Sequence, residues 1–294
     1  RLIFVRGDIA NGELIEGVFR SHRPEMVFHF AAESHVDRSI EDPAPFVRTN
    51  MLGTQILLSA AKRTEVRRFV HVSTDEVYGA LPLDSKDLFH EKRPYAPKSP
   101  YAASKAGSDL LVLAAHHTYG QDVVITNCSN NYGPWQFPEK LIPLMITNAL
   151  AGESLPVYGD GLYVRDWIHV EDHCRAVRAV AEKGGAGETY CIGTENEQPN
   201  IAIVKAILAA TGRDESLIRY VKDRPGHDRR YAIDPTKIRT EIGWTPQIAW
   251  EAGLAATVAW YREHGEWMAR IKSGAFREYY QRHYGPGRDT THAP

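Results

Sequence analysis

Three apolar runs decide the fold of this sequence: MVFHFAA at residues 26–32, RFVHVS at 68–73 and VVITNC at 123–128. Each run has the length of a β-strand. The segments between them, 46–63 and 101–119, read as helices, and Ser99 and Pro100 mark the start of the second as its N-cap and first helical residue. Strands separated by helices of this length form βαβ units, so we predict a parallel sheet with covered faces.

Further along the chain, helical and extended segments are more mixed. Residues 200–211 read as a helix, with Asn200 as a possible N-cap and Gly212 just past its end. A long amphipathic helix follows from about Trp250, and the Gly/Pro/Thr-rich residues 285–294 read as a flexible tail. We therefore predict an α/β fold with a doubly wound, Rossmann-type parallel sheet and a smaller mixed α/β domain.

The beginning of the sequence departs from that pattern. Residues 2–5 look like a strand, yet no Gly-rich turn of the GxGxxG type stands ahead of them. In a doubly wound sheet this turn follows a central strand and holds a pyrophosphate. We expect roughly 50 upstream residues to be missing, about one and a half βαβ units. The alternative is a naturally short protein with a different sheet order.

The composition excludes several classes of function. The 294 residues carry 35 Lys and Arg against 37 Asp and Glu, so no strong overall charge attracts nucleic acid or a membrane surface. The three cysteines form no CxxC pair, which argues against a disulfide framework or a zinc site, and no HExxH motif indicates a metal hydrolase. Neither a signal peptide nor a membrane-spanning run is visible. We expect a soluble, cytoplasmic chain without a metal.

The motif YAASK at residues 101–105 is the first with catalytic potential. Tyr101 and Lys105 lie one turn apart on the same face of the predicted helix. A lysine ammonium and a helix N-terminus both favour the ionised form of a phenol, so the pair predicts a base of lowered pKa. Taken alone, the YxxxK spacing is a weak signal, and a solvated or packing role is the simpler interpretation.

Two polar segments follow predicted strands. STDEVYG at residues 73–79 places Asp75 and Glu76 next to each other, and such a pair acts as acid and base if the site separates their pKa values. FAAESHVDRS at 30–39 follows the first strand, with small alanines and with possible hydrogen-bond donors at Ser34 and His35. Ordinary polar turns remain the alternative for each segment alone. Because both leave the carboxyl edge of one predicted sheet, they can converge with the YAASK helix.

Together these motifs resemble the extended short-chain dehydrogenases/reductases and, among them, the dTDP-glucose 4,6-dehydratase family. The resemblance covers nearly the whole chain through further runs: NCSNNYGPWQFPEKLIPL at 127–144, GDGLYVRDWIHVED at 159–172, DRPGHDRRYAID at 223–234 and GWTP at 243–246. The Asp-Glu pair after Thr74 is the discriminating element within the superfamily.

The resemblance implies a reaction and a role for each catalytic residue. Tyr101, assisted by Thr74, would take the proton of the sugar C4 hydroxyl while hydride passes to NAD, and Lys105 would hold the nicotinamide ribose. Glu76 would then remove the C5 proton, and a protonated Asp75 would donate to the departing C6 hydroxyl. Hydride would finally return to C6 as C5 is reprotonated, so that dTDP-glucose becomes dTDP-4-keto-6-deoxyglucose.

The resemblance also implies binding residues. The adenine end of NAD would meet Asp8 and Ile9. The rest of the cofactor would meet Ala31, Ala32, Thr49, Tyr101, Lys105 and Asn131. The nucleotide sugar would meet Ser34, Thr74, Asn130, Arg165, Asn200, Arg224 and His227. Two of these have simple alternatives, because Asn200 fits a helix N-cap and Arg165 could pair with Asp166.

The same resemblance implies domain boundaries and an oligomeric state. We expect residues 1–131, with 166–193 returning to them, to bind NAD, and 132–165 with 194–284 to bind the sugar nucleotide. Helices 46–63 and 101–119 carry apolar residues on more than one face, which predicts a partner for the second face. The family commonly forms homodimers through a four-helix bundle, so we expect a homodimer.

Two classes of alternative remain open. One is another NAD-dependent nucleotide-sugar dehydratase or a UDP-glucuronate decarboxylase, and base specificity would separate these enzymes. The other is a non-catalytic sugar-nucleotide-binding protein. Such a protein would have lost Tyr101, Lys105 or the Asp75–Glu76 pair, and all four residues are present.

Overall fold

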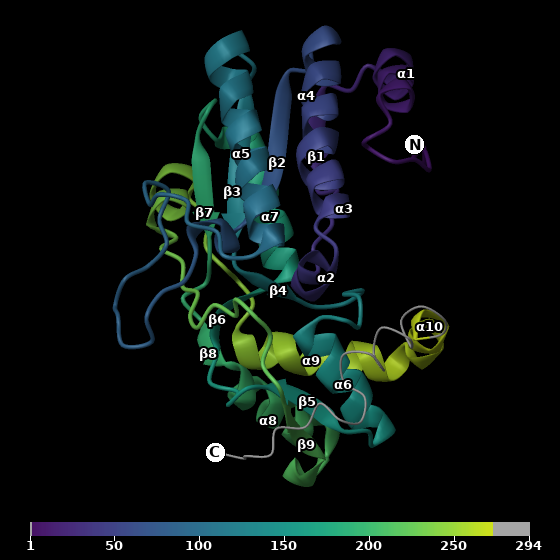
Figure 1. The fold of residues 1–294 in the computed structure, drawn as a ribbon, viewed down its shortest axis with the longest axis vertical. Helices are drawn as coiled ribbons and strands as arrows, with labels where there is room; N and C mark the ends of the chain where they lie inside the picture. Colours follow the sequence, from purple (N-terminus) through teal and green to yellow (C-terminus); the bar gives the residue numbers. More distant parts are fainter. Residues whose placement is uncertain (1, 273–294) are drawn as a thin grey trace.

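The computed structural model describes residues 2–272 and is built around a parallel sheet (Figure 1). The strand order of the sheet is β1-β2-β3-β7, with every neighbouring pair parallel. These strands are β1 (Met26–His29), β2 (Arg68–Thr74), β3 (Val123–Cys128) and β7 (Thr189–Ile192). The three strands expected from the apolar runs are confirmed, and β1 ends earlier than expected, at His29.

Helices cover both faces of this sheet because its strands are apolar on both sides. Phe69 of β2 and Ile125 of β3 pack into one core with Val112, whereas their neighbours Val70 and Val124 pack into another. Side chains that follow one another in a strand point to opposite faces. The first core is covered by α1 (Gly12–His22), α4 (Thr54–Arg63) and α5 (Pro100–Tyr119), and the second by α7 (Val170–Lys183).

The two predicted helices of the sheet region are confirmed. The first comprises α3 (Ala44–Phe46), a π-helical segment (Val47–Gly53) and α4. The second is α5, whose N-cap is Ser99, as predicted: its hydroxyl accepts a hydrogen bond from the backbone N–H of Ala102 at 3.1 Å. Pro100 is the first residue of α5, where its missing N–H removes no helical hydrogen bond.

The remaining elements form a second group, below the sheet in Figure 1. Two small sheets belong to it, with orders β4-β6-β8 and β5-β9. Their strands are β4 (Asn130–Tyr132), β6 (Val164–His169), β8 (Glu197–Pro199), β5 (Leu155–Tyr158) and β9 (Ile218–Val221). The helices that pack against these strands are α6 (Leu141–Ala151), α8 (Asn200–Thr211), α9 (Trp250–Glu263) and α10 (Gly265–Ile271). An apolar core separate from those of the β1–β7 sheet holds this group together.

Shorter helical segments connect these elements. They are α2 (Val36–Glu41), the 3₁₀ segments η2 (Asp75–Tyr78) and η3 (Glu215–Leu217), and the π-helical η4 (Ile238–Ile242). Within residues 2–272, every helix is too short or too polar to cross a bilayer.

Two sequence predictions are wrong. Residues 2–5 form no strand: Leu2 is 93% and Phe4 83% exposed, since no strand in the described part of the chain lies beside them to pair with. Asn200 is not an N-cap but the first residue of α8, and Pro199 occupies the cap position. Gly212 ends α8 with φ of 68°, as predicted. The predicted tail 285–294 lies outside the described residues.

One buried carboxylate fixes α5 to the carboxyl end of the sheet. Asp109 is fully buried, and its Oδ2 accepts hydrogen bonds from the hydroxyls of Ser73 at 2.8 Å and Tyr95 at 3.0 Å. The side-chain amide of Asn127 donates to the same oxygen at 3.3 Å, and Nε2 of His71 lies 3.1 Å from Oδ1. Helix α5 is therefore held by β2 and β3 at the end of the sheet where the polar segments emerge.

This network predicts a large loss of stability on removal of its acceptor. Asp109→Ala leaves several buried donors without a partner, and we expect the free energy of unfolding to fall by about 3 kcal/mol or more. Tyr95→Phe removes one donor only and should cost about 1 kcal/mol. Urea unfolding followed by circular dichroism measures both. Equal stability of the two variants would show that Asp109 is not the centre of the network.

Candidate active site

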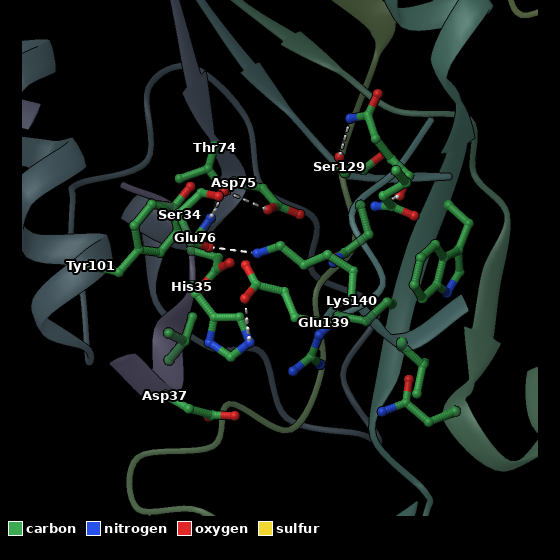
Figure 2. A pocket seen from close by; sticks show the side chains of 18 of the residues that line it. Ser34, His35, Asp37, Thr74, Asp75, Glu76, Tyr101, Ser129, Glu139 and Lys140 are labelled. Atoms are coloured by element: carbon green, nitrogen blue, oxygen red, sulfur yellow. Dashed lines mark hydrogen bonds and ion pairs between the residues drawn. The ribbon is translucent and has the colours of Figure 1, made fainter. Parts of the chain in front are cut away.

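A cavity of about 370 Å³ lies where the carboxyl ends of β1, β2 and β3 meet the second group of elements (Figure 2). Ligands bind at this edge in open α/β sheets. Residues from all three predicted segments line the cavity, among them Ser34, Glu76 and Tyr101. The prediction that the segments converge is therefore confirmed.

The end of β2 places two carboxyl groups in the cavity. The chain turns from β2 into η2 directly after Thr74, whose hydroxyl oxygen accepts a hydrogen bond from the N–H of Glu76 at 3.3 Å. The same hydroxyl lies 3.3 Å from Oδ1 of Asp75 and donates to it. Gly79 closes the turn with φ of 82°, and a Cβ there would lie 2.5 Å from the carbonyl oxygen of Ala96. A glycine is required at that position.

The two carboxyl groups have different surroundings. Asp75 is 2% exposed, and burial together with the neighbouring charge of Glu76 raises its pKa well above its usual range. Burial also raises the pKa of Glu76, but the guanidinium groups of Arg224 and Arg165 counteract the increase. The pKa of Asp75 is thus raised more strongly than that of Glu76, which is the direction that the expected role of Asp75 as the acid requires.

Tyr101 and Lys105 lie in the first turns of α5. Figure 2 shows Tyr101 at the same end of the cavity as Thr74, Asp75 and Glu76. Burial raises the pKa of Tyr101 well above its ordinary value, the charge of Glu76 raises it further, and a hydrogen bond with Thr74 lowers it. The prediction of a lowered phenol pKa is wrong for this structure. Burial outweighs the helix N-terminus, and the ammonium of Lys105 donates to the carbonyl oxygen of Val72 at 2.8 Å.

All seven residues predicted to bind the sugar nucleotide line the cavity: Ser34, Thr74, Asn130, Arg165, Asn200, Arg224 and His227. Arg165 is almost fully buried, and its guanidinium donates to the carbonyl oxygens of Val164 and Asp228, each at 2.8 Å. Its guanidinium carbon lies 4.0 Å from the ring centre of Tyr231. Among the described residues, Asp166 instead accepts hydrogen bonds from the turn after β7, so the alternative Arg165–Asp166 pair is wrong.

Other cavity residues present polar atoms in defined orientations. Nδ1 of His227 lies 2.7 Å from Oδ1 of Asp223, and its ring stacks on Tyr163 with centres 3.6 Å apart. Burial lowers the pKa of His227 to about 4, so its ring is neutral. Oδ1 of Asn130 and Oδ1 of Asn200 are buried without a hydrogen-bond partner in the described part of the chain. Buried polar atoms of this kind are suited to accept hydrogen bonds from a ligand.

The residues predicted to hold NAD divide into two sets. Ala32 and Asn131 line the cavity with Tyr101 and Lys105, and Oδ1 of Asn131 is buried without a hydrogen-bond partner among residues 2–272. This wall fits the polar nicotinamide end of the cofactor. The other set, Asp8, Ile9, Ala31 and Thr49, lies outside the cavity lining. In that set, Asp8 pairs with Arg48 at 3.0 Å.

Sequence reasoning assigned no role to four residues of the cavity wall: Asp37, Glu139, Lys140 and Tyr158. Lys140 donates to the carbonyl oxygen of Ser34 at 2.6 Å, and Arg38 pairs with Glu139 at 2.8 Å. Asp37, Glu139 and Lys140 lie inside the motifs at 30–39 and 127–144, and their charge could have indicated a role in the site. Tyr158 stands outside every motif and had no such signal.

Comparisons with known proteins identify the family. A family model described as GDP-mannose 4,6 dehydratase matches residues 1–257. A dTDP-glucose 4,6-dehydratase of Xanthomonas campestris pv. campestris (strain B100) is 54% identical over 293 residues, which cover 94% of this chain and 83% of that protein.

Two solved structures agree with this assignment. DesIV, a dTDP-glucose 4,6-dehydratase of Streptomyces venezuelae solved with NAD bound, is 51% identical, with a TM-score of 0.89 over 92% of this chain and 83% of that one. A dTDP-glucose 4,6-dehydratase of Bacillus anthracis str. Ames in complex with NAD is 48% identical, with a TM-score of 0.85 over 92% and 82% of the two chains.

These similarities favour neither a decarboxylase nor a non-catalytic binding protein. The chain belongs to the dTDP-glucose 4,6-dehydratase family, the NAD-dependent hydro-lyases among the extended short-chain dehydrogenases/reductases.

Proposed function

We propose that this chain converts dTDP-glucose to dTDP-4-keto-6-deoxyglucose with the residues of the cavity described above. One observation carries the proposal: Asp75, a buried carboxyl of raised pKa, stands next to a second carboxyl, Glu76, in the cavity that also holds Tyr101 and Lys105. Elimination of water needs both an acid and a base on neighbouring carbons.

The first step uses Tyr101 to remove the C4 hydroxyl proton. Bound NAD supplies the hydride acceptor for C4, later returns that hydride to C6, and in its oxidised form brings a positive charge. Such a charge opposes the effect of burial on the Tyr101 phenol. The Thr74 hydroxyl, which donates to Asp75 in the structure, would turn to donate to this phenol and so stabilise its ionised form.

In the second step one carboxyl group accepts a proton and the other donates one. The C4 ketone acidifies the C5–H bond, and Glu76 takes that proton. Asp75 gives its proton to the C6 hydroxyl, which leaves as water. When hydride returns to C6, Glu76 gives its proton back to C5. Burial favours the protonated form of both carboxyl groups, and the guanidinium of Arg224 counteracts this effect at Glu76, the group that must accept a proton.

Binding of the nucleotide part is assigned to the second group of elements. Arg224 and Arg165 supply guanidinium groups for the diphosphate, since a planar fork matches phosphate oxygens. Residues 132–165 and 194–284 would then form the sugar-nucleotide domain, and 1–131 with 166–193 the NAD domain. Separate apolar cores support a division into two groups, but they depart from these boundaries: Ile238, Ile242 and Trp244 pack in the core of the β1–β7 sheet, and Trp167 packs in the core of the second group.

Homodimer formation is a further part of the proposal. Val47, Leu52 and Leu110 are 51%, 47% and 59% exposed and lie on the π-helical segment and α5. A shallow apolar groove between these helices includes Met51 and Leu111. Exposed apolar surface on adjacent helices is typical of a protein interface. We also propose a cytoplasmic location, which three unpaired cysteines support.

The roles of the carboxyl groups predict two different kinetic defects. Glu76→Gln should still reduce NAD when mixed with dTDP-glucose but should lose water at least about 100-fold more slowly, because the C5 base is gone. Asp75→Asn should slow the loss of water more than oxidation. Single-turnover absorbance of reduced nicotinamide and exchange of deuterium from C5 separate the two steps.

The exposed loop residue Asp84 offers a matched control, and Asp84→Asn should keep both parent rates. Release of C5 deuterium at the parent rate by Glu76→Gln would refute the assignment of the base.

The dimer proposal predicts a mass of twice the chain at micromolar concentration in sedimentation velocity. Leu52→Glu combined with Leu110→Glu should shift the protein to monomer, because two charges enter an apolar interface. Leu83→Glu alters a similarly exposed leucine elsewhere, 45% exposed, and should leave the dimer intact. A parent protein that sediments as a monomer would refute this part of the proposal.

A further inference from the structure

Asp37 of α2 joins the two groups of elements across the cavity. Its Oδ1 accepts a hydrogen bond from Nη1 of Arg224 and its Oδ2 accepts one from the hydroxyl of Tyr158, both at 3.1 Å. The Asp37 side chain is 8% exposed and points into the region that Figure 2 shows beside His35 and Glu139. One carboxylate thus holds two donors that are far away in the sequence.

Both donors belong to the second group and lie next to each other there. Tyr158 is the last residue of β5 and is paired with Val221 of β9, and Arg224 follows β9 closely. The two neighbouring cross-links, Lys140 with Ser34 and Arg38 with Glu139, run between the same two parts of the chain. Asp37 is the member of this set that contacts Arg224.

The negative charge of a carboxylate at this position disfavours the binding of an anion. Its presence in the cavity therefore suggests a structural role. The guanidinium of Arg224 lowers the pKa of Asp37, so the carboxylate is ionised. A negative charge in a cavity that accepts a diphosphate repels the ligand. The repulsion between Asp37 and the diphosphate therefore has to be outweighed by the favourable contacts of the side chains that Asp37 holds in place.

The hydrogen-bond pattern of Arg224 identifies that task. Asp37 engages Nη1, whereas Nε is buried and has no hydrogen-bond partner in residues 2–272. The edge of the guanidinium that carries Nε and Nη2 has the spacing of two phosphate oxygens. Held at one corner by Asp37, Arg224 presents its other edge to a ligand.

We infer that Asp37 is a positioning residue for the nucleotide diphosphate, which it serves by holding Arg224 and Tyr158 in their binding orientation. This inference rests on the proposed function, because it takes a nucleoside diphosphate as the ligand. Preorganisation of this kind increases affinity by removing the cost of ordering the side chains on binding. It predicts weaker binding when the carboxylate is lost, although the loss also removes a repulsive charge.

The sign of the effect makes the inference testable. In the NAD-loaded protein, Asp37→Asn should weaken dTDP binding roughly tenfold in isothermal titration calorimetry, because a charged hydrogen bond that orients Arg224 is lost. Asp37→Glu keeps the charge but lengthens the side chain, and it should also weaken binding. Tyr158→Phe should weaken binding less. In turnover of dTDP-glucose, KM should rise with Kd while kcat changes less than about threefold.

A matched control comes from another Asp–Arg pair of the second group. Asp160 pairs with Arg229 outside the cavity lining, and Asp160→Asn removes one negative charge from that region without touching Arg224. Its dTDP affinity should equal that of the parent. The thermal unfolding midpoint of each variant shows whether it folds, and Asp37→Glu serves as the test if Asp37→Asn does not.

Each outcome decides a separate point. Unchanged or tighter dTDP binding by both folded Asp37 variants would overturn the inference. An equal fall of kcat in all variants would reduce Asp37 to a purely structural residue and would overturn it as well. A parent protein that binds dTDP but leaves dTDP-glucose unchanged would refute the proposed function alone. A parent that does not bind dTDP would refute both.

Discussion

Two neighbouring carboxyl groups can act as acid and base only if one keeps its proton at a pH at which the other has lost it. In water Asp75 and Glu76 would both be ionised at neutral pH. In the structure burial raises the pKa of both groups, and that of Asp75 most strongly, while the guanidinium of Arg224 counteracts the increase at Glu76. The sheet and the second group of elements together create that difference.

The fold positions these groups through polar anchors as well as apolar cores. Asp109 ties α5, and with it Tyr101 and Lys105, to the ends of β2 and β3. Asp37 connects the sheet region to Arg224 on the opposite wall. Buried polar groups with several partners specify one geometry more strictly than apolar contacts do. The site thus depends on two buried carboxylates, Asp109 and Asp37.

Much of this arrangement follows from local sequence. The sequence predicts strands β2 and β3, helix α5 and its cap at Ser99. These predictions rest on the spacing of apolar residues and on capping residues, which act over short distances along the chain. The convergence of Thr74, Asp75, Glu76, Tyr101 and Lys105 followed from the rule that parallel strands share a carboxyl edge.

What the sequence could not provide depends on contacts across the fold. The bonds from Asp37 to Arg224 and Tyr158 join residues that are far apart along the chain. The raised pKa of Tyr101 reflects burial, which the YxxxK spacing does not encode. Residues 2–5 have the apolar pattern of a strand, but a strand also needs a neighbour.

The protonation state of Asp75 is the most direct test of the account. Carbon-13 NMR of the NAD-loaded protein with labelled aspartate carboxyls, assigned by the loss of one signal in Asp75→Asn, reports the titration of this group. The account predicts that Asp75 stays protonated at neutral pH and ionises only above it. A midpoint near the ordinary aspartate value of about 4 would contradict it.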